Sequence, residues 1–198
     1  MKNIFKIFLV GLVLIGTTNS CEESTLAIDE LYDSVDTSAA FIRTLSAPST
    51  GPHNISGGNF PTSIEATIEI QEGNGTFQPD FKEVRVYAAI FADQDQTIPI
   101  VDPSNNPFGE TLLMTLPASE FEPSEVNLLP STSFAIPTQT IVDLHPGAQF
   151  TLPTYIYTRL ELELNDGRIF TDVNVGPTVQ SGNYFLAPFF YNIIFLNI

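Results

Sequence analysis

Apolar and polar residues alternate with period two along several short segments of this chain. From residue 63 to residue 70 the even positions are apolar and the odd positions, including Glu69, are polar. The same alternation recurs over residues 83–90. Such a pattern is typical of β-strands that bury one face and expose the other. The other segments that the pattern predicts as strands are residues 40–46, 112–116 and 134–142.

The clearest local signal is a hairpin between residues 155 and 175. Two alternating runs flank residues 165–168, where Asp166-Gly167 supplies the positive φ angles of a two-residue turn. A register shifted by one residue would put Leu164 opposite Arg168, so the pattern favours pairing Asn165 with Arg168. The predicted inward pairs are Leu164 with Ile169, Leu162 with Thr171, and Leu160 with Val173. The predicted outer face carries Tyr157, Arg159, Glu161 and Glu163, which face Phe170, Asp172 and Asn174.

The remaining pattern indicates an all-β chain. Residues 184–198 are apolar on both faces and contain Pro188, which excludes a long regular helix and suits a final buried strand. Short strands with turn signals, without a helical period or a βαβ rhythm, predict an immunoglobulin-like antiparallel β-sandwich over residues 38–198.

The amino-terminal stretch resembles a bacterial lipoprotein signal peptide. Lys2 and Lys6 precede an apolar run at residues 7–15, which is too short to span a membrane as a helix. Ser20 is the small residue expected before a processed cysteine. We therefore predict a signal peptide at residues 1–20 and lipidation of Cys21. The alternative is ordinary cleavage near Ser20, which leaves Cys21 as a free thiol.

The residues that follow Cys21 are acidic. Residues 22–36 contain six acidic residues and no basic one, which predicts a solvated, lipid-anchored tether at residues 21–37. Without residues 1–20 the chain carries 5 basic and 23 acidic groups, a formal charge of −18. Such a surface disfavours nucleic acid and anionic lipid headgroups as partners. Cations and neutral ligands such as glycans are compatible with it as partners.

The sequence carries none of the common catalytic motifs. It has no His-Glu-x-x-His, no Gly-x-Ser-x-Gly, no P-loop and no cluster of Cys and His. His53 and His145 fall in loops rich in Gly and Pro, where solvent exposure is expected. Glu161 and Glu163 could serve a glycosidase as a pair of carboxylates, but their alternation indicates a solvated strand face. We therefore expect a protein that is not an enzyme and needs no cofactor.

Three sets of side chains are candidates for binding. Tyr155, Tyr157 and Phe170 could stack a neutral ligand, although a second element covering them is the simpler interpretation. The predicted register opposes Glu161 and Asp172, whose like charges Arg159 and Arg168 could neutralise; a bound calcium is the alternative. A second oxygen-rich stretch lies in the polar, proline-rich loop at residues 92–110. Its metal ligands would come from Asp93, Asp95, Asp102, Asn105 and Asn106, whose spacing is not that of an EF-hand loop.

Four short motifs together resemble a family. They are residues 40–44 (AFIRT), 116–121 (LPASEF), 159–162 (RLEL) with 165–168 (NDGR), and 182–185 (GNYF). They are similar to small surface lipoproteins of Flavobacteriia found beside SusC/SusD-type nutrient uptake systems, with a SusE-like sandwich domain. Glu22 and Glu23 resemble the acidic export signal of Bacteroidota lipoproteins.

The resemblance implies a cellular location and neighbouring proteins, but no functional residues. It implies a lipoprotein on the outer membrane, exposed at the cell surface, beside a SusD-like protein and a TonB-dependent transporter. The expected function is that of an accessory binding or assembly subunit for glycan uptake. A free-standing glycan-binding or adhesion module is the alternative, and a glycoside hydrolase comes last.

Overall fold

The computed structural model describes residues 38–49, 53–54, 63–148, 150, 153–175 and 189–196. The chain divides into two compact units, Met1–Asp36 and Thr37–Ile198, and every described residue belongs to the second. The predicted signal peptide, the lipidation of Cys21 and the acidic tether therefore lie outside the described residues.

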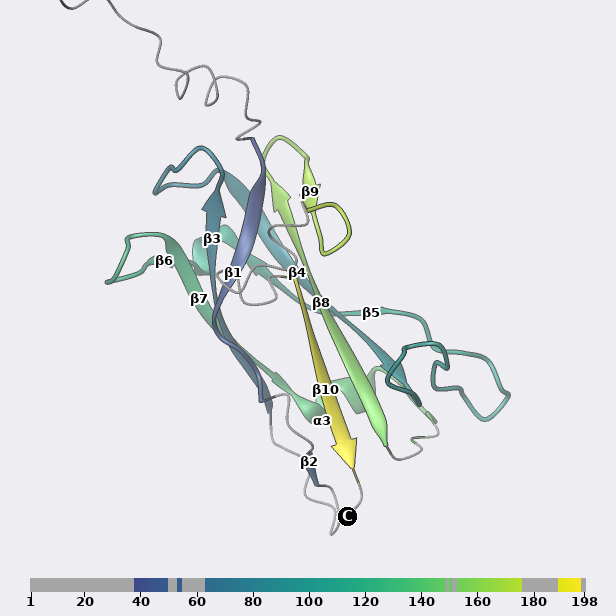
Figure 1. The fold of residues 1–198 in the computed structure, drawn as a ribbon. Coiled ribbons are helices and arrows are strands. Elements are labelled where there is room, and N and C mark those ends of the chain that lie inside the picture. Colours follow the sequence, from purple (N-terminus) through teal and green to yellow (C-terminus); the bar gives the residue numbers. More distant parts are fainter. Residues whose placement is uncertain are drawn as a thin grey trace, which may run out of the picture. The chain divides into compact units, whose positions relative to one another are not determined.

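The described chain folds into two β-sheets (Figure 1). The four-stranded sheet has the order β1-β3-β7-β6, and the six-stranded sheet has the order β2-β10-β8-β4-β5, with β9 beside β8. All pairs are antiparallel except β2 with β10. The prediction of an all-β sandwich is confirmed, while the finer immunoglobulin-like assignment stays a prediction. The strands are β1 (Ala40–Ser46), β2 (His53–Asn54), β3 (Ser63–Glu72), β4 (Phe81–Phe91), β5 (Thr111–Pro117), β6 (Glu122–Pro123), β7 (Pro130–Pro137), β8 (Thr154–Leu164), β9 (Ile169–Phe170) and β10 (Phe190–Leu196).

The alternating positions form the core of the sandwich. The even residues from 64 to 70 in β3, from 84 to 90 in β4, and Leu160, Leu162 and Leu164 in β8 are each at most 3% exposed. Burial of these side chains removes apolar surface from water on the inner face of each sheet, which is the main force that holds two sheets together. The predicted faces of β3, β4 and β8 are confirmed for these apolar residues.

One polar residue departs from the pattern. Glu69 was expected at a wet position of β3, but it is fully buried. Its partner in the register is Arg43 of β1, whose Nη1 lies 2.7 Å from Glu69 Oε1, and Asn127 Nδ2 donates to Oε2 at 2.9 Å. Both carboxylate oxygens thus have a donor, which is the condition under which a carboxylate is found inside a protein.

The segment predicted as a strand at residues 134–142 changes conformation halfway. β7 ends at Pro137, and residues Thr138–Asp143 form the short helix α3. Thr138 and Ile141 are both buried, and a spacing of three residues puts them on one face of a helix but on opposite faces of a strand. Among the residues that the structure describes, the other helical element is η1 (Ala118–Glu120). Within the described ranges, no helix is long and apolar enough to cross a membrane.

The prediction for His145 was wrong. Its side chain is only 1% exposed, because the residues after α3 fold back onto the core. The Nδ1 atom lies 2.6 Å from the carbonyl oxygen of Ile141, and the imidazole packs edge-on against Phe108 at 5.2 Å between ring centroids. The side chain of His53 lies outside what the structure describes, so its predicted exposure stays a prediction.

The predicted hairpin forms, but its register is shifted by one residue. Leu162 pairs with Phe170 and Glu163 pairs with Ile169. The N–H of Leu164 donates to the carbonyl of Arg168 at 2.9 Å, so the loop has three residues, 165–167, instead of two. A three-residue loop ends with a residue of positive φ, and Gly167 supplies it at +88°.

The shifted register reverses the faces of the second arm. Phe170, expected on the outer face, packs against the core, and Ile169, expected inside, is 42% exposed. Val173 was expected opposite Leu160 but is 82% exposed, beyond the end of β9. The side chain of Asn165 donates to Asp80 Oδ1 at 2.6 Å, so the loop is also held by a contact far away in sequence.

Candidate binding face

Partly exposed aromatic side chains line the outer face of the six-stranded sheet. Since the even residues of β8, and those of β4 from residue 84 onward, point into the core, the odd residues between them point outward, as do the residues of β10 that pair with them. One row across the sheet contains Tyr87, Arg159 and Phe190, and another contains Phe91, Tyr155 and Ile194. We call this surface the aromatic face, defined by Tyr87, Phe91, Tyr155, Tyr157 and Phe190.

Tyr157 lies in the middle of this face and is held from two sides. Its ring stacks on Phe190 at 5.5 Å between centroids with an interplanar angle of 29°. Its hydroxyl donates to Asp172 Oδ2 at 2.9 Å. Burial raises the pKa of Tyr157, and the hydrogen bond to the Asp172 carboxylate raises the pKa further. The hydrogen bond to Asp172 and the stacking on Phe190 together keep this ring in place.

Arg159 borders the aromatic rings and is surrounded by acceptors. Its Nε and Nη2 each donate to one oxygen of Glu110 at 2.8 Å, and its Nη1 donates to Glu161 at 3.1 Å. The hydrogen bond that Arg159 donates to Glu110 is the largest cause that raises the pKa of Arg159. The guanidinium carbon also lies 4.6 Å from the centroid of the Tyr87 ring. Such a paired guanidinium presents a flat surface with little free charge.

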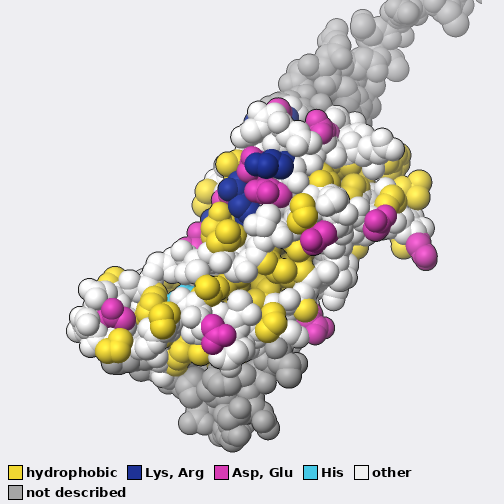
Figure 2. Space-filling view, turned by 180° about the vertical axis from the view of Figure 1, so that it is seen from behind, with side chains coloured by type: hydrophobic (Ala, Val, Ile, Leu, Met, Phe, Trp, Pro, Cys, Tyr) yellow, Lys and Arg dark blue, Asp and Glu magenta, His cyan; other side chains and the backbone are white. Residues whose placement is uncertain are grey.

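Further ion pairs continue along the outer face beyond Arg159. Lys82 Nζ lies 2.8 Å from Glu163, and Arg85 pairs with Glu83, Glu161 and Glu163. The hydrogen bond from Lys82 is the largest cause that lowers the pKa of Glu163. Figure 2 shows Lys and Arg side chains gathered in one group with acidic side chains among them, next to hydrophobic side chains. Opposite charges neutralise one another here, so the aromatic face adjoins a surface of small net charge.

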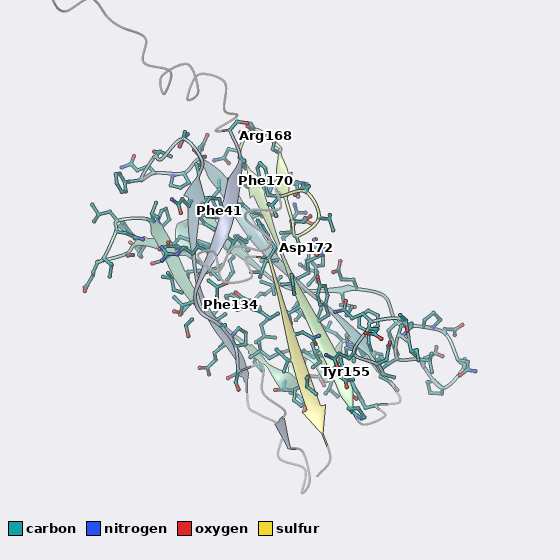
Figure 3. The ribbon with its side chains drawn as sticks, in the orientation of Figure 1. Phe41, Phe134, Tyr155, Arg168, Phe170 and Asp172 are labelled. Atoms are coloured by element: carbon teal, nitrogen blue, oxygen red, sulfur yellow. The ribbon has the colours of Figure 1, made fainter. Side chains whose placement is uncertain are left out.

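The structure brings together only part of the predicted aromatic set. Tyr155 and Tyr157 share the outer face of β8, but Phe170 lies opposite Leu162 on the core side. Tyr155 and Leu162 are seven residues apart on one strand, which separates them by about 23 Å. Figure 3 shows Phe170 and Tyr155 at opposite ends of the sheet.

Sequence reasoning missed three members of the aromatic face. Tyr87 and Phe91 occupy outward positions of β4 that the alternation of that strand already indicated. Phe190 could be placed only once the neighbours of β8 were known, because β10 is the adjacent strand in space and not in sequence.

The two predicted metal ligands, Glu161 and Asp172, each have another partner in the structure. Glu161 is paired with Arg85 and Arg159, while Asp172 accepts a hydrogen bond from Tyr157. Arginine neutralisation therefore involves Arg159, as predicted, and also Arg85; Arg168 instead pairs with Asp166 at 2.7 Å. In the described ranges no group of three or more His, Cys, Asp or Glu side chains is arranged to hold a metal ion. A bound calcium stays a prediction.

The carboxylates of the proline-rich loop hold the loop itself. Asp93 accepts hydrogen bonds from the backbone and hydroxyl of Thr97 and from the N–H of Ile98. Asp102 accepts from the N–H of Ser104 and from the backbone and side chain of Asn106, and the Asn106 side chain is the main cause that lowers the pKa of Asp102. These bonds are those of side chains that shape turns.

The chain was compared with models of protein families and with curated proteins. Neither comparison gives a match.

Proposed function

We propose that this protein is a non-catalytic lipoprotein of the outer membrane surface, which serves as an accessory binding or assembly subunit of a SusC/SusD-type glycan uptake system. The pattern around Cys21 supports the lipid anchor, and the family resemblance supports the uptake setting. The observation that carries the binding role is the aromatic face.

The aromatic face suits a neutral, partly apolar ligand. Rings such as Phe190, which is 38% exposed, offer flat apolar surface, and the hydroxyl and guanidinium groups beside them offer fixed hydrogen-bonding partners. Sugar rings combine apolar faces with hydroxyl edges and fit this chemistry. The same face favours the second candidate function, a free-standing glycan-binding or adhesion module.

Hydrolysis of a glycoside is the function that the geometry supports least. A glycosidase needs a carboxylic acid of raised pKa to protonate the leaving group. Glu163 has a lowered pKa and pairs with Lys82 and Arg85, and Glu161 pairs with Arg85 and Arg159. The pairing of both carboxylates with basic side chains suits a structural role.

The strand order supports the finer fold assignment as well. Immunoglobulin-like domains place strands A, B, E and D in one sheet and strands G, F and C in the other, with C′ at the edge in the variable type. Numbered along the chain, the orders β1-β3-β7-β6 and β10-β8-β4-β5 follow this arrangement. We infer an immunoglobulin-like domain, whose sheet faces and loops commonly serve recognition.

Co-purification from detergent-solubilised outer membranes tests the proposal. A SusC/SusD-type pair should be recovered with the wild-type protein, and Cys21→Ala should lose both membrane attachment and a metabolically incorporated lipid label. A protein that purifies alone but binds a polysaccharide affinity gel would favour the free-standing module. In either case Tyr155→Ala should weaken glycan binding, whereas Phe77→Ala, at a ring that is 61% exposed outside the aromatic face, should not.

A further inference from the structure

The four-stranded sheet has an open stretch along one edge. β7 pairs with β3 over residues 63–69, but β1 pairs with β3 only over residues 67–72. Within the described part of the chain, residues 63–66 of β3 therefore have a strand on one side only. The reason lies in the path of the chain, because β1 ends at Ser46 and the next strand, β2, pairs with β10 in the other sheet (Figure 1).

A hollow of about 280 Å³ adjoins this open stretch. Apart from Glu65 and Phe134, the side chains that line it are small: Ser46, Ala66, Thr67, Ser133 and Ala135. Thr67 and Ser133 hydrogen-bond to each other at 2.8 Å. Glu65 is exposed and accepts a hydrogen bond from Ser63 at 2.6 Å, and no described basic side chain forms an ion pair with it. The hollow thus has an anionic wall without a counter-charge.

We propose that this edge binds an extended, basic segment of a partner protein. The segment adds to the sheet beside residues 63–66, because the unpaired N–H and C=O groups of an edge strand form hydrogen bonds with a further strand. A residue directly opposite Glu65 in an added strand lies on the same face, with its Cβ about 5 Å from that of Glu65. A Lys or Arg at that position meets the carboxylate and can lie across the small side chains of the hollow.

The charge and the lining of the hollow distinguish this occupant from others. The chain has a formal net charge of −16, which repels acidic segments and a second copy of the same chain. Phe134 contributes to the wall but is only 5% exposed, so its ring is not available to stack on a sugar. The hollow lies on the four-stranded sheet and the aromatic face on the six-stranded sheet, so this inference does not depend on the proposed function.

Peptide binding to the full-length protein in detergent micelles tests the proposal. The probe is a fluorescein-labelled peptide of alternating threonine and lysine, measured by fluorescence anisotropy at low ionic strength. Its counterpart with glutamate in place of lysine, and a form of the lysine peptide N-methylated at every residue, should bind at least tenfold more weakly. The glutamate peptide carries the opposite charge, and the N-methylated peptide lacks the backbone N–H donors.

Matched variants locate the binding. Glu65→Gln should weaken binding of the lysine peptide about two- to fivefold, the range of an exposed ion pair, and Glu120→Gln, another exposed carboxylate, should not. The proposal is overturned if the N-methylated peptide binds as tightly as the unmethylated one, or if Glu65→Gln and Glu120→Gln weaken binding equally. Either result would mean that an acidic protein attracts a basic peptide without a specific site. Absence of lysine-peptide binding overturns it too. If maltoheptaose instead shifts the amide resonances of Thr67 and Ser133, the hollow is a sugar site and the proposal is overturned.

Discussion

The two arms of the hairpin, β8 and β9, differ in how strictly the fold uses their alternation. β8 has a strand on each side, β10 and β4, and it alternates between buried and partly exposed residues over its whole length. β9 pairs with β8 over two residues only, and the chain then leaves the sheet through a turn in which the Thr171 N–H donates to the Asn174 side chain. Neighbours on both sides enforce the alternation in β8, whereas the loop decides the register of β9.

This difference shows in which strands a pattern of apolar residues determines the register. Shifting β8 by one residue would expose Leu160, Leu162 and Leu164, each now at most 2% exposed. Shifting β9 exchanges Ile169 for Phe170, one apolar residue for another. The energetic penalty for the shift is small in the short arm, so the geometry of the loop at residues 165–167 prevails.

The largest effect is expected in the central strand. Leu162→Ala removes a fully buried side chain and should lower the free energy of unfolding by about 2 to 5 kcal/mol. Glu163→Ala on the outer face should lower it far less, because ion pairs at the surface contribute little to stability. Urea unfolding measures both variants. Similar midpoints would mean that the two faces of β8 do not differ in burial.

A smaller effect should distinguish the two registers of the hairpin. Phe170→Ala should cost about 1 to 3 kcal/mol, less than a fully buried phenylalanine, because the ring packs against the core only in part. Ile169→Ala and Val173→Ala, at exposed positions, should each stay within about 0.5 kcal/mol of the wild type. The register expected from the pattern requires the reverse order, so thermal unfolding of the three variants decides between them.

The smallest effect concerns the outer face of β8 and depends on pH. The pKa of Glu163 is lowered from its ordinary value of 4.5 through the hydrogen bond from Lys82. Its stabilising contribution is therefore fully present above pH 4.5 and is lost as the pH falls through the lower pKa of the folded state. Glu163→Gln should be less stable than the wild type at pH 7, and the difference should shrink at pH 3.

Urea unfolding at the two pH values measures this change in the difference. The control is Glu120→Gln, which replaces an exposed carboxylate that forms no ion pair with a described basic side chain. The same change with pH for both variants would show that the ion pairs of Glu163 have no special part in it.

Much of the fold could be predicted because burial imposes a period of two on long strands. The bounds of β1 were predicted correctly, and so were the buried positions of β3, β4 and β8. The predictions are wrong where a contact distant in sequence determines the burial or the conformation of a residue. Arg43 and Asn127 allow Glu69 to be buried, and the packing of Thr138 and Ile141 converts the end of a predicted strand into α3.

The candidate face could be predicted only in part, for a related reason. Tyr155 and Tyr157 follow from the alternation of one strand, but Phe190 joins them through the order of strands in the sheet. Phe170 was included only because the register was misjudged. A surface built from three strands depends on pairings that a local pattern does not contain.

The pairing of β2 with β10 affects the order in which the domain can fold. The four-stranded sheet uses only residues between 40 and 137, so its strands are all available early during synthesis. In the six-stranded sheet, His53 pairs with Phe195, and β10 lies between β2 and β8. Contacts between such distant positions form slowly. Until residues 190–196 arrive, β2 has no partner and the apolar inner faces of both sheets stay incompletely covered, so an emerging chain must be shielded from aggregation for most of its synthesis.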